Sequence, residues 1–273
     1  MKFLTDRGHI SRNITIHDQI AHKYDALHGE IFNDIEQSRL FAALTCARDA
    51  VRSNSCPIRA LDFGCGSGNL TRYLLNLGLA VTAADVSQGF LDLVQSQYHS
   101  DFLTTLRLNG SNLDGVPDGS FDLIAVYSVL HHIPDYFSAI QELARVCKRG
   151  GVIIIDHEAT EEFWHANPVY TKFRSAALRF DWRKYTKFSN YLHKARRLFN
   201  PRHTNEGDIH VWADDHIEWA RIKNFLLNCG FQVVLDEDYL LYHNLYQRQV
   251  YDRYLGHCTD TKVMIFRKDN DSK

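Results

Sequence analysis

The residues best suited to chemistry lie in one glycine-rich segment, Asp62-Phe63-Gly64-Cys65-Gly66-Ser67-Gly68-Asn69. A short apolar stretch precedes this segment and an amphipathic stretch follows it, as expected for a turn between a strand and a helix. Glycines in such a turn adopt backbone conformations that other residues avoid, and they let a ligand approach the main chain closely. The segment therefore predicts a ligand-binding turn at the carboxyl end of a strand.

The spacing of these glycines argues against two common nucleotide sites. A dinucleotide fingerprint needs a third glycine where this chain has Asn69 or Thr71, depending on which glycine is counted first. A P-loop is excluded because no Gly-Lys-Ser/Thr sequence follows. Asp62 instead precedes three glycines that are spaced by one residue each. A carboxylate in that place suits a ligand with a cationic amine better than one with a pyrophosphate.

A second carboxylate, Asp85, closes the next apolar stretch of the chain. At the end of a neighbouring parallel strand, a carboxylate can accept hydrogen bonds from both hydroxyls of a ribose. The alternative is an acid that only favours the N-terminus of the following helix. Its combination with the glycine-rich turn favours the ribose-binding interpretation.

Short apolar stretches alternate with amphipathic ones around these motifs. We expect strands over 58–63, 80–84, 102–108, 121–127, 151–155, 230–235 and 261–267. We expect helices over 14–30, 31–52, 68–77, 88–98, 134–147 and 214–228, with Arg149-Gly150-Gly151 ending the fifth of them. Such alternation is typical of βαβ units, so the predicted fold is α/β, with a doubly wound, mostly parallel sheet.

Composition narrows the class of protein further. Hydrophobic residues make up 45% of the 273 residues, charged residues 23%, and the formal net charge is −2, which gives no general argument for nucleic-acid binding. No apolar run reaches the roughly 18 residues of a membrane span. Asp6-Arg7 interrupts the N-terminal stretch before a secretory signal could form. The six cysteines show no metal-ligand spacing, so we expect a cytoplasmic protein with reduced thiols.

Four segments in this order resemble class I S-adenosylmethionine-dependent methyltransferases, in particular the small-molecule type that includes quinone-biosynthesis methyltransferases. The segments are Ala60–Gly68, Ala84–Ser87, Pro117–Leu123 and Val129–Asp135. The resemblance is dense over 58–157, loose over 212–268 and absent from 160–210. It implies a Rossmann-like sheet of seven strands, the last of them (261–267) antiparallel, and S-adenosyl-L-methionine as the cofactor.

The resemblance also implies a single methyltransferase domain over 1–273 with four parts. These are a helical N-terminal cover (1–56), a cofactor-binding core (57–159), a helical basic and aromatic insert (160–210) and the C-terminal part of the sheet (211–273). In related enzymes, an insert at this point commonly covers the substrate. A tyrosine-rich stretch, 239–254, is expected to face it.

Roles by position follow from the same resemblance. The methionine end of the cofactor would be held by Asp62 and by the backbone of Gly64, Cys65, Gly66 and Gly68. Asp85 would hold the ribose, and Val86 would pack on the adenine. The loop after the third strand, with Asn109, Gly110 and Ser111, would contact the adenine. Asn109 aligns with an acid that is common in the family, and Asn112 is the alternative.

Methyl transfer needs a nucleophile aligned for in-line attack on an electrophilic carbon, in a site without water. An oxygen or carbon nucleophile also benefits from a base, often histidine. His157, directly after the fifth strand, is the first candidate base, and His132 of the fourth segment is the second. For both, the alternative is a supporting hydrogen bond or a packing role.

Two tyrosines complete the predicted site. Tyr127, which ends the fourth strand, would border the transferred methyl group. Tyr24 lies in a segment that resembles one folding over the cofactor in many family members, where its ring could contact the sulfonium by a cation–π interaction. The alternative for Tyr24 is a core position in a docking helix. Because a catechol-type magnesium site would place a carboxylate where Tyr127 stands, we expect no metal.

The composition of the insert is compatible with several kinds of binding partner. Residues 170–205 contain ten Lys or Arg residues and a single acid, Asp181, with eight aromatic residues between them. This pattern suits a simple lid with a solvated basic face, recognition of an anionic or phosphorylated substrate, or binding to nucleic acid or an anionic membrane. We expect a small-molecule acceptor, and neither nucleic acid nor a membrane as partner. The alternatives are a tRNA or protein methyltransferase and a non-catalytic cofactor-binding protein. The oligomeric state is not predicted.

Overall fold

The computed structural model describes residues 28–110, 112–165, 167–178 and 217–270. Its strands are β1 (Arg59–Phe63), β2 (Ala80–Asp85), β3 (Leu103–Arg107), β4 (Phe121–Tyr127), β5 (Cys147–Ala159), β6 (Phe231–Tyr239) and β7 (Thr261–Lys268). The helices are α3 (Asp34–Ala50), α4 (Asn69–Asn76), α5 (Gln88–Gln97), α6 (Tyr136–Val146), α7 (Glu161–Trp164), α8 (Pro168–Ala177), α10 (Trp219–Asn228) and α11 (Arg248–Tyr254), with a short 3-10 helix, η2 (Leu130–His132).

The seven strands form one sheet in the order β3-β2-β1-β4-β5-β7-β6. β1 to β5 are parallel to one another, whereas β7 runs antiparallel to both β5 and β6. The predicted doubly wound α/β fold, its seven strands and its antiparallel last strand are therefore confirmed.

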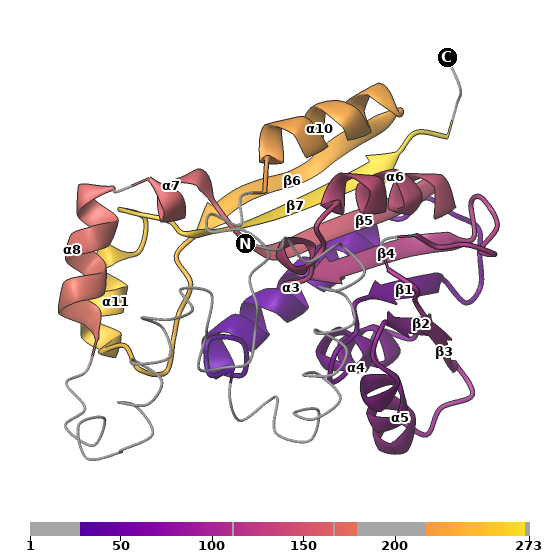
Figure 1. Cartoon of the computed structure of the whole chain (residues 1–273), viewed down its shortest axis with the longest axis horizontal. Helices are drawn as coiled ribbons and strands as arrows, with labels where there is room; N and C mark the ends of the chain where they lie inside the picture. Colours follow the sequence, from indigo (N-terminus) through magenta and orange to yellow (C-terminus); the bar gives the residue numbers. More distant parts are fainter. Residues whose placement is uncertain (1–27, 111, 166, 179–216, 271–273) are drawn as a thin grey trace, which may run out of the picture.

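Helices cover both faces of the sheet (Figure 1). On one face, α3 and α4 pack on apolar side chains such as Val81, Leu123 and Ile154, and α5 packs beside them. On the other face, α6 and α10 enclose a second apolar layer that includes Ile124 and Ile153. Because neighbouring residues of a strand point to opposite faces, the unbroken apolar runs of β4 and β5 supply both layers.

Three predicted helices begin later along the chain than expected, among them the helix over 214–228, which begins at Trp219. The helix expected over 31–52 begins only at Asp34, because the Asn33 side chain caps it by accepting hydrogen bonds from the N–H groups of Ile35 and Glu36. The helix expected over 134–147 begins at Tyr136.

The predicted stop signal Arg149-Gly150-Gly151 lies inside β5 and not after a helix. β5 begins at Cys147, and its register with β4 shifts between the pairs made by Phe121 and Leu123. This irregularity takes up the extra residues of β5. The glycines therefore belong to the start of a strand that is longer than the predicted 151–155.

Parts of two predicted segments lie outside the described residues, namely most of the helix over 14–30 and most of the insert over 160–210. The described part of the insert forms α7 and α8. α8 packs against α11 of the tyrosine-rich stretch, at one end of the sheet (Figure 1). Phe173, which is fully buried, lies at the centre of this contact, among the rings of Tyr246, Tyr251 and Tyr254.

A buried carboxylate fastens α8 to the sheet. The Tyr170 hydroxyl donates a hydrogen bond of 3.0 Å to one oxygen of Asp260, and the Leu241 N–H donates one of 2.8 Å to the other. Burial raises the pKa of Asp260 to about 6. The hydrogen bond between Tyr170 and Asp260 therefore connects α8 to the residue that precedes β7.

We predict that Tyr170→Phe lowers the free energy of unfolding by about 1–2 kcal/mol, because it removes a buried hydrogen bond and keeps the ring. Urea unfolding measures this change. Tyr254→Phe, in the same aromatic cluster, serves as the control and should have a smaller effect. Equal losses in the two variants would contradict the anchoring role of Tyr170.

A second buried carboxylate connects β1 to α4. The Thr71 hydroxyl, in the first turn of α4, donates a 2.6 Å hydrogen bond to Asp62. Complete burial raises the pKa of Asp62 to about 7, although the hydrogen bonds from Thr71 oppose this rise. The ordinary pKa of an aspartate is 3.8, so the folded protein holds this proton at pH values where the unfolded chain has lost it.

The stability contributed by the neutral Asp62 carboxyl is therefore lost as the pH rises toward about 7. We predict that Asp62→Asn, which cannot ionise, gains stability relative to the wild type between about pH 5 and pH 8. Chemical unfolding at a series of pH values tests this, with the exposed Asp92→Asn as control. A difference between Asp62→Asn and the wild type that does not change with pH would contradict the raised pKa.

Candidate functional site

The glycine-rich turn lies between β1 and α4, as predicted, and its backbone requires glycine. Gly64 and Gly68 have φ angles of 75° and 90°. A Cβ atom on Gly64 would lie 2.5 Å from the side chain of Val129, and one on Gly68 would lie 2.8 Å from the ring of Tyr98. The N–H groups of Gly64 and Cys65 both donate to the carbonyl of Ala84, which ties the turn to β2.

Asp85 braces this turn from the end of β2. Its carboxylate accepts the N–H of Gly66 at 3.0 Å and the N–H of Ser87 at 2.8 Å. Ser87 in turn caps α5 by accepting the N–H of Phe90. One buried carboxylate therefore positions both the turn after β1 and the helix after β2.

The turn and Asp85 border a cavity of about 300 Å³. Ile31 and Phe32, which precede α3, form part of its wall. It extends from the turn to the carboxyl end of β4 and to η2. Of the predicted site residues, it is lined by Gly64, Cys65, Gly66, Asp85, Val86, Gly110, Tyr127 and His132. The volume is at the lower end of the range of small-molecule sites.

The remaining predicted residues have other places. Asp62 and Gly68 do not line the cavity, and the Asp62 carboxylate is occupied by Thr71. Asn109 is exposed and also lies off the cavity wall, where Leu108 and Gly110 take its place. His157 lies behind Tyr127 and does not line the cavity. Tyr24 and Ser111 lie outside the described residues.

Sequence reasoning missed Asn69, the first residue of α4. This residue lines the cavity, and both its amide nitrogen and its amide oxygen are buried without a hydrogen-bond partner. A buried polar group without a partner is costly, so the amide is poised for a ligand that both accepts and donates hydrogen bonds. An α-amino acid group, with its carboxylate and ammonium, fits this requirement.

The charges in the cavity wall also suit a cation. Among the described lining residues, Asp85 and Asp135 carry carboxylates and none is Lys or Arg. With Asn69 and the glycine-rich turn, these residues fit the amino acid, ribose and sulfonium groups of S-adenosylmethionine. The cofactor implied by the sequence therefore agrees with the polar groups that the structure presents.

Two aromatic residues lie side by side on β4 and β5: Tyr127 ends β4, and His157 lies within β5, not directly after the strand as predicted. The rings of Tyr127 and His157 stack with centroids 4.7 Å apart and an angle of 29° between their planes. The Tyr127 hydroxyl oxygen and the His157 Nε2 are both buried and have no hydrogen-bond partner. Burial raises the pKa of Tyr127 well above its ordinary value, so the phenol is neutral.

His157 is also held neutral. Burial, and after it the positive charge of Arg39, lowers the pKa of His157 to about 3. A general base works best when its pKa lies near the working pH. In this environment, His157 is better suited to form a hydrogen bond as a neutral imidazole than to accept a proton as a strong base.

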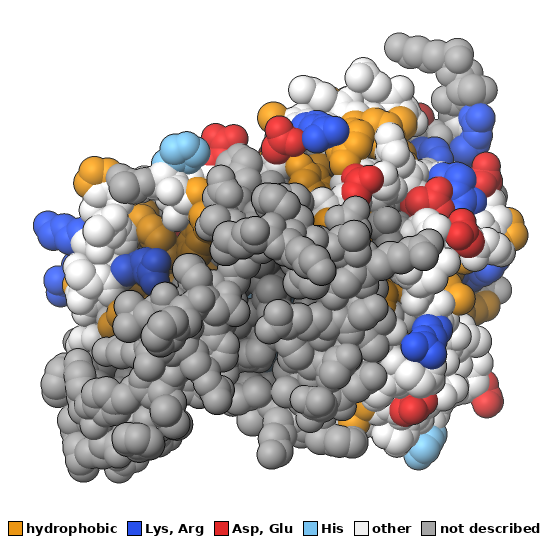
Figure 2. All heavy atoms as spheres, in the orientation of Figure 1, with side chains coloured by type: hydrophobic (Ala, Val, Ile, Leu, Met, Phe, Trp, Pro, Cys, Tyr) orange, Lys and Arg blue, Asp and Glu red, His pale blue; other side chains and the backbone are white. Residues whose placement is uncertain are grey.

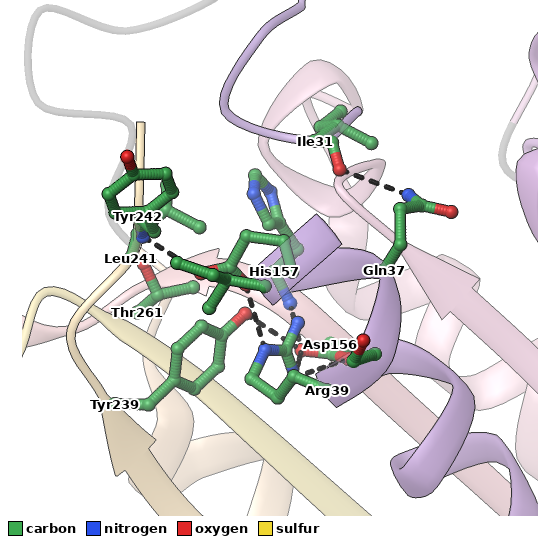
Figure 3. A network of polar contacts seen from close by, with 12 residues as sticks. Ile31, Gln37, Arg39, Asp156, His157, Tyr239, Leu241, Tyr242 and Thr261 are labelled. Atoms are coloured by element: carbon green, nitrogen blue, oxygen red, sulfur yellow. Dashed lines mark hydrogen bonds and ion pairs between the residues drawn. The ribbon is translucent and has the colours of Figure 1, made fainter. Parts of the chain in front are cut away.

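Asp156 and Arg39 form an ion pair beside these aromatic residues, which the sequence alone did not indicate (Figure 3). Arg39 Nη1 lies 3.2 Å and 3.0 Å from the two carboxylate oxygens of Asp156. The Tyr239 hydroxyl donates to the same carboxylate at 3.0 Å. Both oxygens of Asp156 are thus engaged by protein groups.

Glu158 holds the loop after β4 in place. Its Oε1 accepts the N–H groups of Val129 and Leu130 at 2.8 Å and 2.7 Å, and its Oε2 lies 2.7 Å from His131 Nδ1. His131 therefore supports the loop, while the neighbouring His132 lines the cavity.

The described part of the chain contains neither a cluster of metal ligands nor a helix that could span a membrane. Within residues 28–110, 112–165, 167–178 and 217–270, no three His, Cys, Asp or Glu side chains are grouped as metal ligands would be. Over the same ranges, every helix is too short or too polar to cross a lipid bilayer.

Comparisons with known proteins agree with this site. A family model described as "Methyltransferase domain" matches residues 61–155. A demethylmenaquinone methyltransferase of Staphylococcus epidermidis is 30% identical over 145 residues, which are 51% of this chain and 57% of the relative, so the chain spans little more than half of that protein. One from Tropheryma whipplei is 29% identical over 230 residues, 81% of this chain and 90% of the relative.

The fold has solved counterparts as well. A crystal structure of an S-adenosylmethionine-dependent methyltransferase from Mesorhizobium loti has a TM-score of 0.53 and 18% identity, and the match covers 83% of this chain and 96% of that one. At this identity, the likeness supports the fold alone. Together with the glycine-rich turn, Asp85 and the strand order, these findings support a class I S-adenosylmethionine-dependent methyltransferase domain, which the family model matches over residues 61–155.

Proposed function

We propose that the protein transfers a methyl group from S-adenosylmethionine to a small, largely apolar and uncharged acceptor. The observation that carries this proposal is the continuous cavity, which joins the glycine-rich turn and Asp85 to the ends of β4 and η2. One end of this cavity suits the cofactor, and the other end, beside Tyr127 and His132, would receive the acceptor. A protein that only stored the cofactor would not need that second end.

The residues of the chain would bind and orient both molecules. Asp85 would accept the ribose hydroxyls, while Val86, Phe90 and Leu108 would surround the adenine. The backbone of the turn and Asn69 would hold the methionine end. The cofactor, when bound, supplies an electrophilic methyl group. The chain then has to place the acceptor in line with this group and exclude water, and this placement provides much of the rate.

The wall near the end of β4 favours an apolar acceptor. Ile31, Phe32, Val129, Ile133 and Pro134 contribute apolar side chains there. Because no Lys or Arg occurs among the described lining residues, this wall does not support the anionic or phosphorylated acceptor that the basic insert suggested. The relatives named as demethylmenaquinone methyltransferases also support a small-molecule acceptor.

The described part of the face in Figure 2 does not carry the basic area that binding of nucleic acid would need. On the face shown in Figure 2, Lys and Arg side chains of the described residues are interspersed with Asp and Glu and form no continuous basic area. RNA binding with a steep salt dependence would nevertheless overturn the small-molecule proposal in favour of a tRNA methyltransferase.

Calorimetric titration with S-adenosylhomocysteine tests the cofactor site. We predict saturable binding by the wild-type protein, and a loss of about ten- to a hundredfold in Asp85→Asn, because charged hydrogen bonds to the ribose are removed. His157→Gln should bind nearly as well as the wild type, and so should the exposed control Asp92→Asn. No binding by the wild type, or equal losses at Asp85 and His157, would count against the proposal.

A second titration isolates the role of Asn69. We predict that Asn69→Ala weakens S-adenosylhomocysteine about tenfold, because the amide no longer binds the amino acid end. The affinity for 5′-methylthioadenosine, which lacks the amino acid group, should not change. Asn76→Ala, at the exposed end of the same helix, is the matched control. Equal losses for both nucleosides would show that Asn69 acts on the turn as a whole.

A further inference from the structure

A buried polar cluster lies where α3 meets the ends of β5 and β6. Arg39 is at its centre: its guanidinium bridges both oxygens of Asp156, donates to Glu36 at 2.9 Å, and lies 3.8 Å from the centre of the Tyr239 ring. Glu36 and Asp156 are each only 1% exposed. Burying three charged groups is costly, and an ion pair of this kind often adds little net stability. Because net stability does not explain this buried cluster, its position next to the cavity suggests a role in function.

The next contact leads from this cluster to His157. The Asp156 Oδ1 accepts the backbone N–H of His157 at 2.7 Å (Figure 3). His157 has a φ angle of 62°, in the left-handed region that residues with a side chain rarely adopt. A strained conformation persists only where surrounding contacts enforce it. The carboxylate that enforces it here is itself fixed by Arg39 and by the Tyr239 hydroxyl.

The conformation of His157 affects how the Tyr127 side chain is held at the wall of the cavity. It places the imidazole against the ring of Tyr127, which lines the cavity. The Tyr127 hydroxyl and the His157 Nε2 are buried without a partner. Because Tyr127 lines the cavity, its hydroxyl can form a hydrogen bond with an uncharged oxygen group there, a hydroxyl or a carbonyl, while His157, which does not line the cavity, packs against the tyrosine ring from behind.

The charges around His157 fit this arrangement. Burial of His157 has the largest effect on its pKa, and the titratable groups that act on it are Arg39, Glu30 and His131. Arg39 lowers the pKa of His157, whereas Glu30 raises it. Arg39 itself stays charged, because burial, which lowers its pKa, is outweighed by the negative charges around it, that of Asp156 first. The same guanidinium thus fixes the backbone of His157 and keeps its ring neutral.

We propose that Arg39 and Asp156 are positioning residues, which through His157 hold the Tyr127 ring so that its hydroxyl can form a hydrogen bond with a hydroxyl or carbonyl oxygen of the methyl acceptor. The proposal rests on the proposed function, because it assigns the acceptor to this end of the cavity. Arg39, Asp156 and His157 do not line the cavity, so they act through Tyr127 and not on a ligand directly.

Nuclear magnetic resonance of the histidine ring protons tests the proposal without knowledge of the acceptor. His157→Gln identifies the His157 signals, which the Tyr127 ring displaces from their ordinary positions. In Arg39→Gln, we expect these signals to move toward ordinary positions and the pKa of His157 to rise by about one unit or more. Arg48→Gln, on the same helix, is the control and should change neither. A folded Arg39→Gln protein with wild-type His157 signals and pKa would overturn the proposal.

A milder variant covers the case in which Arg39→Gln does not fold. Tyr239→Phe removes one hydrogen bond from Asp156 and keeps the ion pair, and we expect the His157 ring signals to move. The matched control is Tyr251→Phe, which removes another buried tyrosine hydroxyl, bonded to the Leu240 carbonyl. His157 signals that stay in place in Tyr239→Phe would overturn the positioning role.

Binding of S-adenosylhomocysteine to the same samples separates the two proposals. Arg39→Gln should bind it within about twofold of the wild type, because Arg39 does not line the cavity. Absence of binding by the wild type would remove the proposed function and leave the positioning result intact. Loss of binding in Arg39→Gln together with unmoved His157 signals would overturn the positioning role alone.

Discussion

The parallel register of β1, β2 and β4 is the constraint on which the whole site depends. Phe63, the last residue of β1, pairs with Ala84 on β2 and with Val126 on β4. The next positions along these strands, including Asp85 and Tyr127, therefore reach the same edge of the sheet as the glycine-rich turn. A shift by a single residue would turn these side chains to the opposite face. Hydrogen bonds of the strand ladders, far more than any loop contact, thus decide which groups border the cavity.

Electrostatics divides this edge into two halves. Near the turn, Asp85 meets backbone N–H groups and faces the cavity, which suits a cationic sulfur nucleoside. Near β5, the carboxylate of Asp156 is neutralised within the protein by Arg39, and the groups left without partners, on Tyr127 and His157, are uncharged. This division agrees with the proposed arrangement, in which a charged cofactor lies beside an uncharged acceptor.

Local patterns predicted those features that depend on neighbours in the chain. Apolar runs of five to seven residues indicated the strands, and the spacing of glycines with Asp85 indicated the turn and its partner, because strand period and turn chemistry are short-range properties. The same reasoning placed Asp62 at the cofactor, but it did not indicate the hydrogen bond that one oxygen of this carboxyl group accepts from Thr71. It also extended the helix predicted over 134–147 to Cys147, where β5 in fact begins. The register shift that lengthens β5 arises from its pairing with β4, which no local pattern reveals.

The sequence by itself determined the fold class, the family and the cofactor, because these follow from the order and spacing of short motifs. Only the tertiary structure decided which side chains meet at the acceptor end. Arg39 comes from a helix far from Asp156 in the chain, and Glu158 reaches back to the loop after β4. No local pattern marks such contacts, because the free energy that selects them comes from burial and from pairing of charges once the sheet and α3 have come together.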